Sequence, residues 1–198
     1  MNTLPKTDPC WKVVIVDDHE RSRTTLRAAI WNAGGDVAGE AVRAGDAMPL
    51  LRRVGPDVSI FAAGLPDGDG VAAAAQAVTD AQCPVVLFTS HTRADLVDRA
   101  RTAGVMAFLL KPLRAPELAP TLDLAVARFR EARELRQSLE ARKFIERAKG
   151  HLMARFGLTE DEAFRRLRRA AMDSRRPMVE VARALLVSES LTKDVRTV

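Results

Sequence analysis

The sequence has no tyrosine, and aromatic residues make up only 5% of its 198 residues. Its two cysteines, Cys10 and Cys83, are too few and too isolated for a disulfide framework or a metal knuckle, so we interpret them as an incidental thiol and a small core residue. No run of about 18 apolar residues could span a bilayer, and residues 1–10 lack the apolar centre of a signal peptide. These absences predict a cytoplasmic protein without a membrane partner.

The formal charge of +5 is distributed unevenly along the chain. Residues 1–115 contain 13 basic and 13 acidic residues, whereas residues 116–198 contain 18 basic and 13 acidic ones, so the whole surplus lies in the second part. Arginine outnumbers lysine there by 15 to 3. Such a surplus is typical of a surface that binds a phosphate backbone, although a solvated helical face gives the same composition. The C-terminal part is therefore the candidate nucleic-acid interface.

Apolar runs and helical segments alternate through the N-terminal half. The pattern predicts strands at 13–16, 36–40, 58–62, 84–88 and 106–110, with helices at 20–33, 45–53, 70–79 and 93–103 between them. Five βα units predict an α/β domain at 12–125, built on an open, doubly wound parallel sheet and preceded by a leader at 1–11. Ligands of such sheets bind at the carboxyl ends of the strands, which here carry Asp17, Asp18, Ala62, Thr89 and Lys111.

Four short motifs follow one another in this half. They are Asp17-Asp18, Leu65-Pro66-x-x-Asp69-Gly70, Thr89-Ser90 and Phe108-x-x-Lys111-Pro112. With these motifs, residues 12–125 resemble the receiver domain of bacterial two-component response regulators. The resemblance implies that the acid pair helps to hold Mg²⁺, that an aspartate at the end of the third strand accepts a phosphoryl group, and that the lysine stabilises this group during transfer. It also implies a histidine kinase or another regulatory protein as the source of the signal.

The sequence departs from the receiver pattern at the phosphoryl-accepting position. Alignment on Pro66 and Asp69 places Ala62 where the family has its aspartate, and a shift by one residue brings up a second alanine. Alanine has no lone pair with which to form an acyl phosphate, and one metal-binding carboxylate is lost with the aspartate. We therefore predict an atypical receiver without a phosphoryl acceptor, in which Asp67 and Asp69 are turn residues rather than substitutes.

The other residues of this site each have two interpretations. Thr89 and Lys111 match a switch hydroxyl and a fixed cation in receivers, but Lys111 could equally form a salt bridge with Asp17 or Asp18. The two aspartates could hold Mg²⁺ weakly, or be neutralised by a lysine or a proton. Phe108 matches the aromatic residue that reorients on activation, whereas most aromatic residues in apolar strands belong to the core. We expect no required cofactor.

A connecting helix is predicted over residues 116–142. Apolar residues at three-four spacing form one helical seam, which consists of Leu118, Leu122, Ala125, Phe129, Ala132 and Leu139. This seam could join two chains as a coiled coil, which would make the protein a homodimer. Alternatively, it could pack on the receiver-like half or continue into the next segment, because Arg136 and Lys143 interrupt its apolar character.

Three short amphipathic helices are predicted in an all-α domain at 135–188, followed by a tail at 189–198. The first helix ends at Gly157, the second begins with a capping box of Thr159 and Glu162, and the third begins near Pro177.

The motifs of this segment are Glu146-Arg147-Ala148-Lys149-Gly150-x-Leu152-Met153, Gly157-x-Thr159-Glu160-x-Glu162-Ala163-Phe164-x-x-Leu167, Ala171-Met172 and Val181-Ala182. With them, the segment resembles the ANTAR output domain, a three-helix RNA-binding module of transcription antitermination regulators. The resemblance implies binding to paired stem-loops in mRNA leaders, which prevents a terminator hairpin from forming. A receiver, a long helix and this module also stand in the order that is usual for the family.

Arginine suits RNA because its planar guanidinium group both stacks on bases and binds phosphate with two parallel hydrogen bonds. We predict that the RNA contacts, led by Lys149 within the ANTAR motif, are Arg142, Lys149, Arg165, Arg168, Arg169, Arg175 and Arg176. The three phenylalanines of the segment are predicted to be buried, so no aromatic stacking platform is expected. They are Phe144, Phe156 and Phe164.

Two other functions stay open at this level. The chain could be a signalling adaptor that acts through protein contacts, or a DNA-binding regulator with a helix-turn-helix around Gly157. An enzyme is not expected, because no nucleophile-base pair, metal-ligand cluster or phosphate-cradling glycine loop is present. The favoured prediction is an RNA-binding antitermination regulator, dimeric when active, that is controlled by protein contacts.

Overall fold

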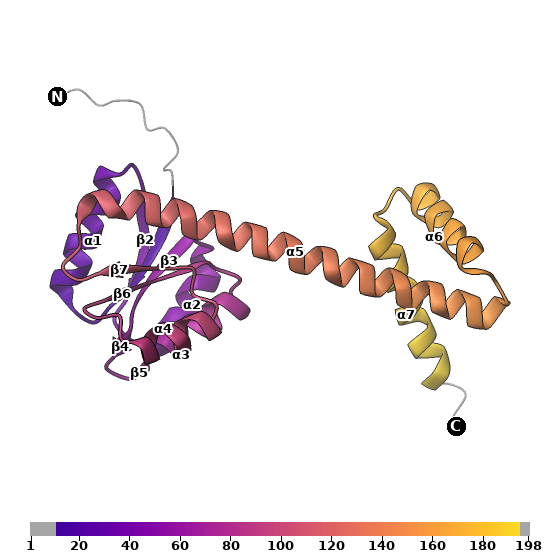
Figure 1. The fold of residues 1–198 in the computed structure, drawn as a ribbon, viewed down its shortest axis with the longest axis horizontal. Helices are drawn as coiled ribbons and strands as arrows, with labels where there is room; N and C mark the ends of the chain where they lie inside the picture. Colours follow the sequence, from indigo (N-terminus) through magenta and orange to yellow (C-terminus); the bar gives the residue numbers. More distant parts are fainter. Residues whose placement is uncertain (1–10, 195–198) are drawn as a thin grey trace. The chain divides into compact units, whose positions relative to one another are not determined.

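The computed structural model describes residues 11–194, with side chains described as far as residue 188 (Figure 1). Apart from Trp11, the predicted leader lies outside the described residues, as do Cys10 and the end of the predicted tail. The chain divides between Glu131 and Ala132 into two compact units. We call them the N-terminal and C-terminal units and describe each by itself.

The N-terminal unit contains the predicted five-stranded parallel sheet. Its strands are β1 (Lys12–Val16), β2 (Asp36–Ala41), β3 (Val58–Ala62), β6 (Val85–Thr89) and β7 (Ala107–Leu110), in the spatial order β2-β1-β3-β6-β7. Strands β3 and β6 are buried along their whole length, which explains why their sequences are continuously apolar. A short antiparallel pair that the sequence pattern did not predict, β4 (Gly64–Leu65) and β5 (Gly68–Asp69), follows β3.

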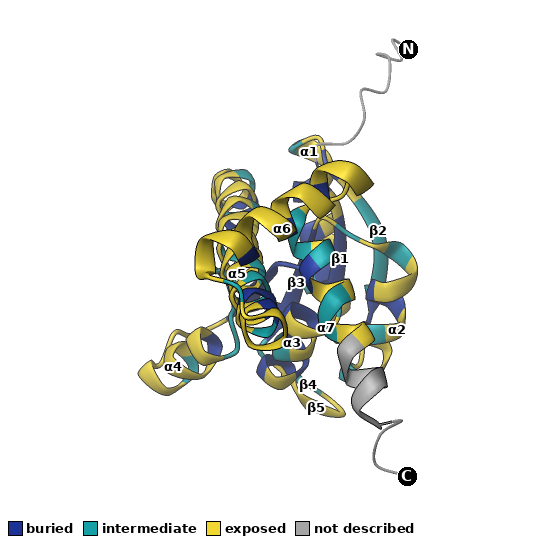
Figure 2. Ribbon diagram, turned by 90° about the vertical axis from the view of Figure 1, so that its right-hand side faces the viewer, coloured by how far each residue is buried: buried dark blue, intermediate teal, exposed yellow. Residues whose placement is uncertain are grey.

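Helices cover both faces of this sheet (Figure 1, Figure 2). Helix α1 (Glu20–Asn32) and the beginning of α5 (Ala115–Phe156) lie on one face, and α2 (Ala44–Val54), α3 (Gly70–Thr79) and α4 (Ala94–Thr102) on the other. Alternating side chains of β1 supply the two layers, since Val13 and Ile15 pack with α1 and α5, and Val14 and Val16 with α2 and α3. The α/β fold is thus the predicted one.

Trp11 and Cys83 belong to this core, and only the second was predicted from the sequence. Trp11 packs in the core layer formed with α1 and α5, and its indole Nε1 donates a hydrogen bond to Asp123 Oδ1 at 3.1 Å. Cys83 is buried, and this burial raises the pKa of its thiol to about 11. A thiol in this environment is protonated at neutral pH, in agreement with a small core residue.

The connecting helix and the first helix of the C-terminal unit are one continuous helix. The sequence predicted a separate short helix there, whereas α5 runs for 42 residues to Phe156. Gly150 does not interrupt it, because an interior glycine costs only about 1 kcal/mol relative to alanine. The helix ends where Gly157 adopts a positive φ of 65°.

The apolar seam on α5 is divided between two environments. Leu118, Leu122 and Ala125 are fully buried against the sheet, and Phe129 is nearly so. Leu139, by contrast, is 49% exposed. The first part of the seam is therefore core, and a coiled coil with a second chain could use only residues that follow it.

The C-terminal unit consists of the last turns of α5 with α6 (Glu160–Ser174) and α7 (Met178–Asp194). Its small core is formed by Ala148, Leu152, Ala163, Leu167 and Ala182. Helix α6 begins with the predicted capping box, in which the side chains of Thr159 and Glu162 each accept from the other's backbone N–H.

The prediction that all three phenylalanines of this unit are buried is wrong. Phe144 is half-buried, but Phe156 and Phe164 are 47% and 38% exposed. Phe164 follows the buried Ala163 directly, so the helical twist turns it away from the core. Phe156 is the last residue of α5 and lies beyond the residues that form the core cluster.

No helix within residues 11–194 combines the length and the apolar character that crossing a membrane requires.

Candidate functional site

The carboxyl ends of the parallel strands bring the predicted residues Asp17 and Lys111 together. Asp17 follows β1 and is 1% exposed, and its Oδ2 lies 2.7 Å from the Lys111 ammonium. The same ammonium stands over the ring of Phe88, 4.9 Å from its centroid. Of the two interpretations of Lys111, the structure thus contains the salt bridge, and its partner is Asp17.

Asp18 pairs with a residue that the sequence analysis did not select. Its Oδ1 lies 2.7 Å from Nδ1 of His19, whose backbone N–H donates to Asp17 Oδ1 at 2.8 Å. Ligand atoms of these three residues lie within 4.8 Å of one another. The set fits Mg²⁺ poorly, because Lys111 takes one oxygen of Asp17 and Ala62 contributes no carboxylate.

Ala62 ends β3 beside this pair of acids. The register pairs Val16 with Phe61, so that Asp17 and Ala62 follow on neighbouring strands. The alanine is buried, with 3% of its surface exposed. A Cβ on Gly70 would overlap the carbonyl oxygen of Ala62, and this close approach explains the glycine of the Asp69-Gly70 motif.

Asp67 and Asp69, which follow β3, accept hydrogen bonds from backbone N–H groups at the N-termini of helices. Asp67 accepts from the backbone N–H groups of Ala44 and Gly45 at 2.7 and 3.0 Å, and these bonds lower the pKa of its carboxyl group. Asp69 is the N-cap of α3 and also pairs with Arg99. The turn interpretation is confirmed for Asp67, which lies in the turn between β4 and β5, whereas Asp69 ends β5 and caps α3.

The two remaining residues of the predicted site face other partners. Thr89 is buried, and its hydroxyl donates to the carbonyl of His91 at 3.2 Å. Phe108 is half-buried and packs against the core layer formed with α2, α3 and α4.

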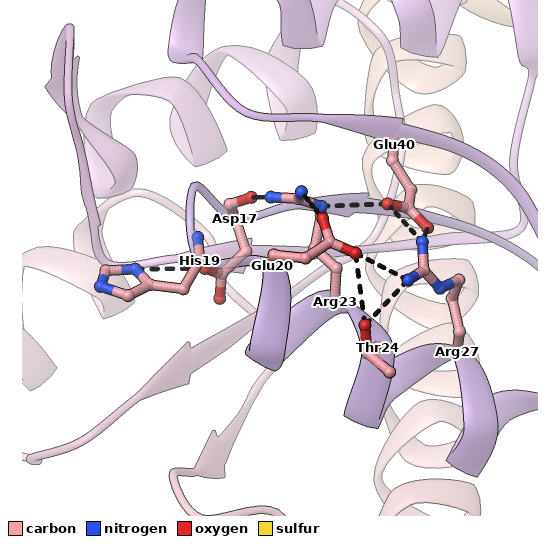
Figure 3. Close-up of polar contacts among 7 residues, drawn as sticks. All are labelled: Asp17, His19, Glu20, Arg23, Thr24, Arg27 and Glu40. Atoms are coloured by element: carbon pink, nitrogen blue, oxygen red, sulfur yellow. Dashed lines mark hydrogen bonds and ion pairs between the residues drawn. The ribbon is translucent and has the colours of Figure 1, made fainter.

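An arginine-glutamate network, which the sequence analysis missed, holds the end of β1 in place (Figure 3). Arg23 is 9% exposed, donates to the carbonyl of Asp17 at 2.7 Å, and pairs with Glu40 at 3.0 Å and with Glu20. Arg27 pairs with the same two glutamates, and its hydrogen bond lowers the pKa of Glu20. The spacing of Glu20, Arg23 and Arg27 along one helix was the only local signal.

Lys149, predicted to lead the RNA contacts, is instead an internal link between α5 and α6. Only 8% of the residue is exposed. Its ammonium donates to both carboxylate oxygens of Glu146 at 3.0 Å and to Glu160 at 2.6 Å, so its three donors are used. The bond to Glu160, followed by that to Glu146, raises the pKa of Lys149, and the lysine lowers the pKa of Glu160. This geometry favours a structural role.

Helix α6 presents four exposed arginines, which we call the α6 arginine face. They are Arg165, Arg166, Arg168 and Arg169. Together with Met172 and two acids, Glu162 and Asp173, they line a hollow on the exposed side of the helix. Among the described residues, no carboxylate lies within 4.0 Å of any of these guanidinium groups. The predicted Arg142, Arg175 and Arg176 are likewise exposed and lack such a partner within residues 11–188.

Three glutamates near this face are bound by other groups. Glu162 accepts from the backbone N–H and the hydroxyl of Thr159, bonds that lower the pKa of its carboxyl group. Glu146 and Glu160 are both held by Lys149. The capping box and the Lys149 link therefore hold three carboxylates in other hydrogen bonds and outside ion-pair distance of the arginines, and after Thr159 the charge of Arg165 also lowers the pKa of Glu162. The four arginines outnumber the two acids of the hollow, so a net positive charge remains available for an anionic ligand.

The fold and the strand-end site define the class of this protein. The family model for the response regulator receiver domain matches residues 13–123, and that for the ANTAR domain matches residues 133–186. The chain belongs to the response regulators that carry an ANTAR domain, a regulatory rather than catalytic family.

One relative is similar along nearly the whole chain. The transcriptional regulatory protein PdtaR of Mycobacterium tuberculosis (strain ATCC 25618 / H37Rv) is 38% identical over 190 residues, which are 92% of this chain and 93% of PdtaR.

Solved structures match the N-terminal part of the fold. The signal receiver domain of a modulated diguanylate cyclase from Desulfovibrio desulfuricans G20 has a TM-score of 0.58 at 25% identity, covering 62% of this chain and 98% of that one. A LuxR-family response regulator from Aurantimonas sp. SI85-9A1 has a TM-score of 0.55 at 28% identity, covering 59% and 85%.

Proposed function

We propose that this chain is an RNA-binding transcription antitermination regulator whose receiver works without aspartyl phosphate. The observation that carries the proposal is the α6 arginine face, which lies within an ANTAR domain and has no carboxylate partner among the described residues. Arg142, Arg175 and Arg176 extend the same positive charge. Lys149 is left out of the proposed contacts, since its ammonium is already bound.

The chemistry of arginine supports RNA as the ligand. Side chains cannot read the deep, narrow major groove of an A-form helix, so proteins recognise loops and phosphates instead. Guanidinium groups bind phosphate oxygens through paired hydrogen bonds and also stack on unpaired bases. By likeness to the family, the target class is paired stem-loops in mRNA leaders.

The receiver unit supplies the regulation in this proposal. With Ala62 at the end of β3, no carboxylate stands at the position that accepts a phosphoryl group in related receivers, and Lys111 is bound to Asp17. Control therefore passes through protein contacts, from a histidine kinase or another regulatory protein, or through dimerisation. For dimerisation, the exposed Leu135 and Leu139 of α5 are the proposed contacts.

Binding of the full-length protein to a pool of tandem RNA hairpins with randomised loops tests the RNA assignment. We expect enrichment of particular loops, competition by the enriched RNA but not by duplex DNA of equal length, and a steep loss of affinity with salt. Duplex DNA that competes as well as RNA would support the DNA-binding alternative. Absence of binding to the pool at low salt would support the adaptor alternative and contradict the proposal.

Treatment with acetyl phosphate and Mg²⁺ tests the receiver assignment. We expect the mass of the natural chain not to increase by a phosphoryl group. The control is an Ala62→Asp variant, which has a carboxylate at the acceptor position and is treated in the same way. A phosphoryl adduct on the natural chain at an aspartate would refute this half of the proposal. The oligomeric state of both proteins, measured by light scattering, shows whether an adduct changes association.

A further inference from the structure

An exposed aromatic ring lies beside the α6 arginine face. Phe156 is the last residue of α5, and 47% of it is exposed although it is a large apolar residue. The guanidinium carbon of Arg166 stands 4.5 Å from the ring centroid, and that of Arg155 stands 5.5 Å away. Arg166 belongs to the α6 arginine face, so this face contacts the ring through one of its own side chains.

The position of the ring is fixed by the packing of α5 against α6. Gly157 turns the chain directly after Phe156, and Leu152 and Leu167 lie in the common core of the two helices. The Lys149 link to Glu160 ties the same two helices together at 2.6 Å. The backbone that carries the ring is therefore held in place before a ligand binds, which limits the conformational entropy lost on binding.

The surroundings of the ring are those of a nucleic-acid stacking site. Arg169 lies three positions after Arg166 on α6 and therefore neighbours it on the same side of the helix, so a further cation stands next to the arginine that covers the ring. Proteins bind unpaired bases by stacking them on aromatic rings and guanidinium planes, while neighbouring cations hold the phosphates. An acidic or apolar protein partner would match either the arginines or the ring, whereas a nucleotide matches both.

We propose that Phe156 and Arg166 form a stacking site for one unpaired base of an RNA loop. This inference rests on the proposed RNA-binding function and names the residue that contacts a loop base within it. Stacking on Phe156 requires a base at that loop position, whereas contacts of the arginines with phosphates do not. The site replaces the expectation, made from the sequence, that the protein has no aromatic platform.

The test compares Phe156→Leu and Phe156→Trp in the full-length protein, with the best-binding hairpin from the pool as the probe. We expect the leucine variant, which keeps an apolar side chain but has no ring, to bind about tenfold more weakly. The tryptophan variant should keep the affinity, because it keeps a stacking surface. The salt dependence should not change in either variant, since no charge is removed.

Phe164→Leu is the matched control. Phe164 is 38% exposed in the same unit, and within the described residues no cationic group is recorded over its ring. We expect this variant to bind as the natural protein does. Thermal unfolding of each variant shows whether it is folded under the binding conditions.

Hairpins that carry an abasic nucleotide at one loop position at a time provide a second measurement. At one loop position, the abasic hairpin should bind the natural protein about tenfold more weakly than the intact hairpin does. The Phe156→Leu variant should bind this abasic hairpin and the intact one with equal affinity. If every abasic hairpin binds the natural protein normally, or if both leucine variants lose the same affinity, the stacking site is refuted while RNA binding stands. If the natural protein binds no hairpin, the proposed function itself has failed.

Discussion

Replacement of two arginines on the α6 arginine face should lower the salt dependence of RNA binding by a calculable amount. In the Arg165→Gln and Arg169→Gln double variant, two exposed guanidinium groups one helical turn apart are lost. Each phosphate contact contributes about 0.7 to the slope of log affinity against log salt for single strands and about 0.9 for duplexes. The slope should therefore fall by about 1.4 to 1.8 if both arginines bind phosphate.

This change in slope has a direct consequence for affinity. The advantage of the natural protein over the double variant should be roughly tenfold larger at 50 mM than at 200 mM salt. The fold should be little affected, within about 0.5 kcal/mol, because the substitutions lie on the surface. No acid is left unpaired by them, since neither arginine has a carboxylate partner among the described residues.

Fluorescence anisotropy of a labelled hairpin at four or more salt concentrations measures both slopes. The control is Arg52→Gln with Arg53→Gln in α2, which removes the same charge from two exposed positions of the N-terminal unit. This control should keep the natural slope. Equal slopes for the two double variants would show that the α6 arginine face does not contact phosphate and would refute the reasoning.

Three further predictions concern interactions that stabilise the two units. Thr159→Ala should lower the free energy of unfolding of the C-terminal unit by about 1 kcal/mol in urea, because α6 loses its N-cap; an unchanged transition would argue against the capping box. Lys149→Gln should reduce stability at neutral pH without changing the salt slope of RNA binding, and a changed slope would restore Lys149 as an RNA contact. In the natural protein, the ion pair of Lys149 with Glu160 should stabilise the folded state fully at any pH between 4.5, the usual pKa of glutamate, and 10.5, the usual pKa of lysine. Its contribution should be lost as the pH falls through the lowered pKa of Glu160 or rises through the raised pKa of Lys149, which urea unfolding across pH measures. Gly70→Ala should cost the N-terminal unit about 3 kcal/mol or more because its Cβ would meet the carbonyl of Ala62, whereas Gly64→Ala, whose Cβ meets no atom within 4 Å, is the control that should unfold normally.

Local signals in the sequence were sufficient for the elements and their order. Continuous apolar runs marked β1, β3 and β6, because strands covered on both faces are apolar at every position. The capping box of Thr159 and Glu162 marked the start of α6, since its two hydrogen bonds join residues only three apart. These features depend on neighbours in the chain, and the structure follows them closely.

Local signals were not sufficient for the ends of helices and the burial of single side chains. The pattern divided α5 into two helices, although the chain offers no stop before Gly157. It also assigned Phe156 to the core, whereas a core made largely of alanine and leucine leaves the ring at its edge. Helical periodicity indicates the direction in which a side chain points, but it does not show how far the neighbouring helices extend to cover that side chain.

The sequence by itself determined the fold class, the concentration of arginine in the C-terminal part and the alanine at the end of β3. Only the tertiary structure decided which charges are free. It bound Lys111 to Asp17 across 94 residues and Lys149 to Glu160 across 11, while leaving the α6 arginine face without an ion-pair partner among the described residues. The physical reason is that an ion pair requires two groups within about 4 Å of each other, a distance that packing sets and that spacing along the chain does not reveal.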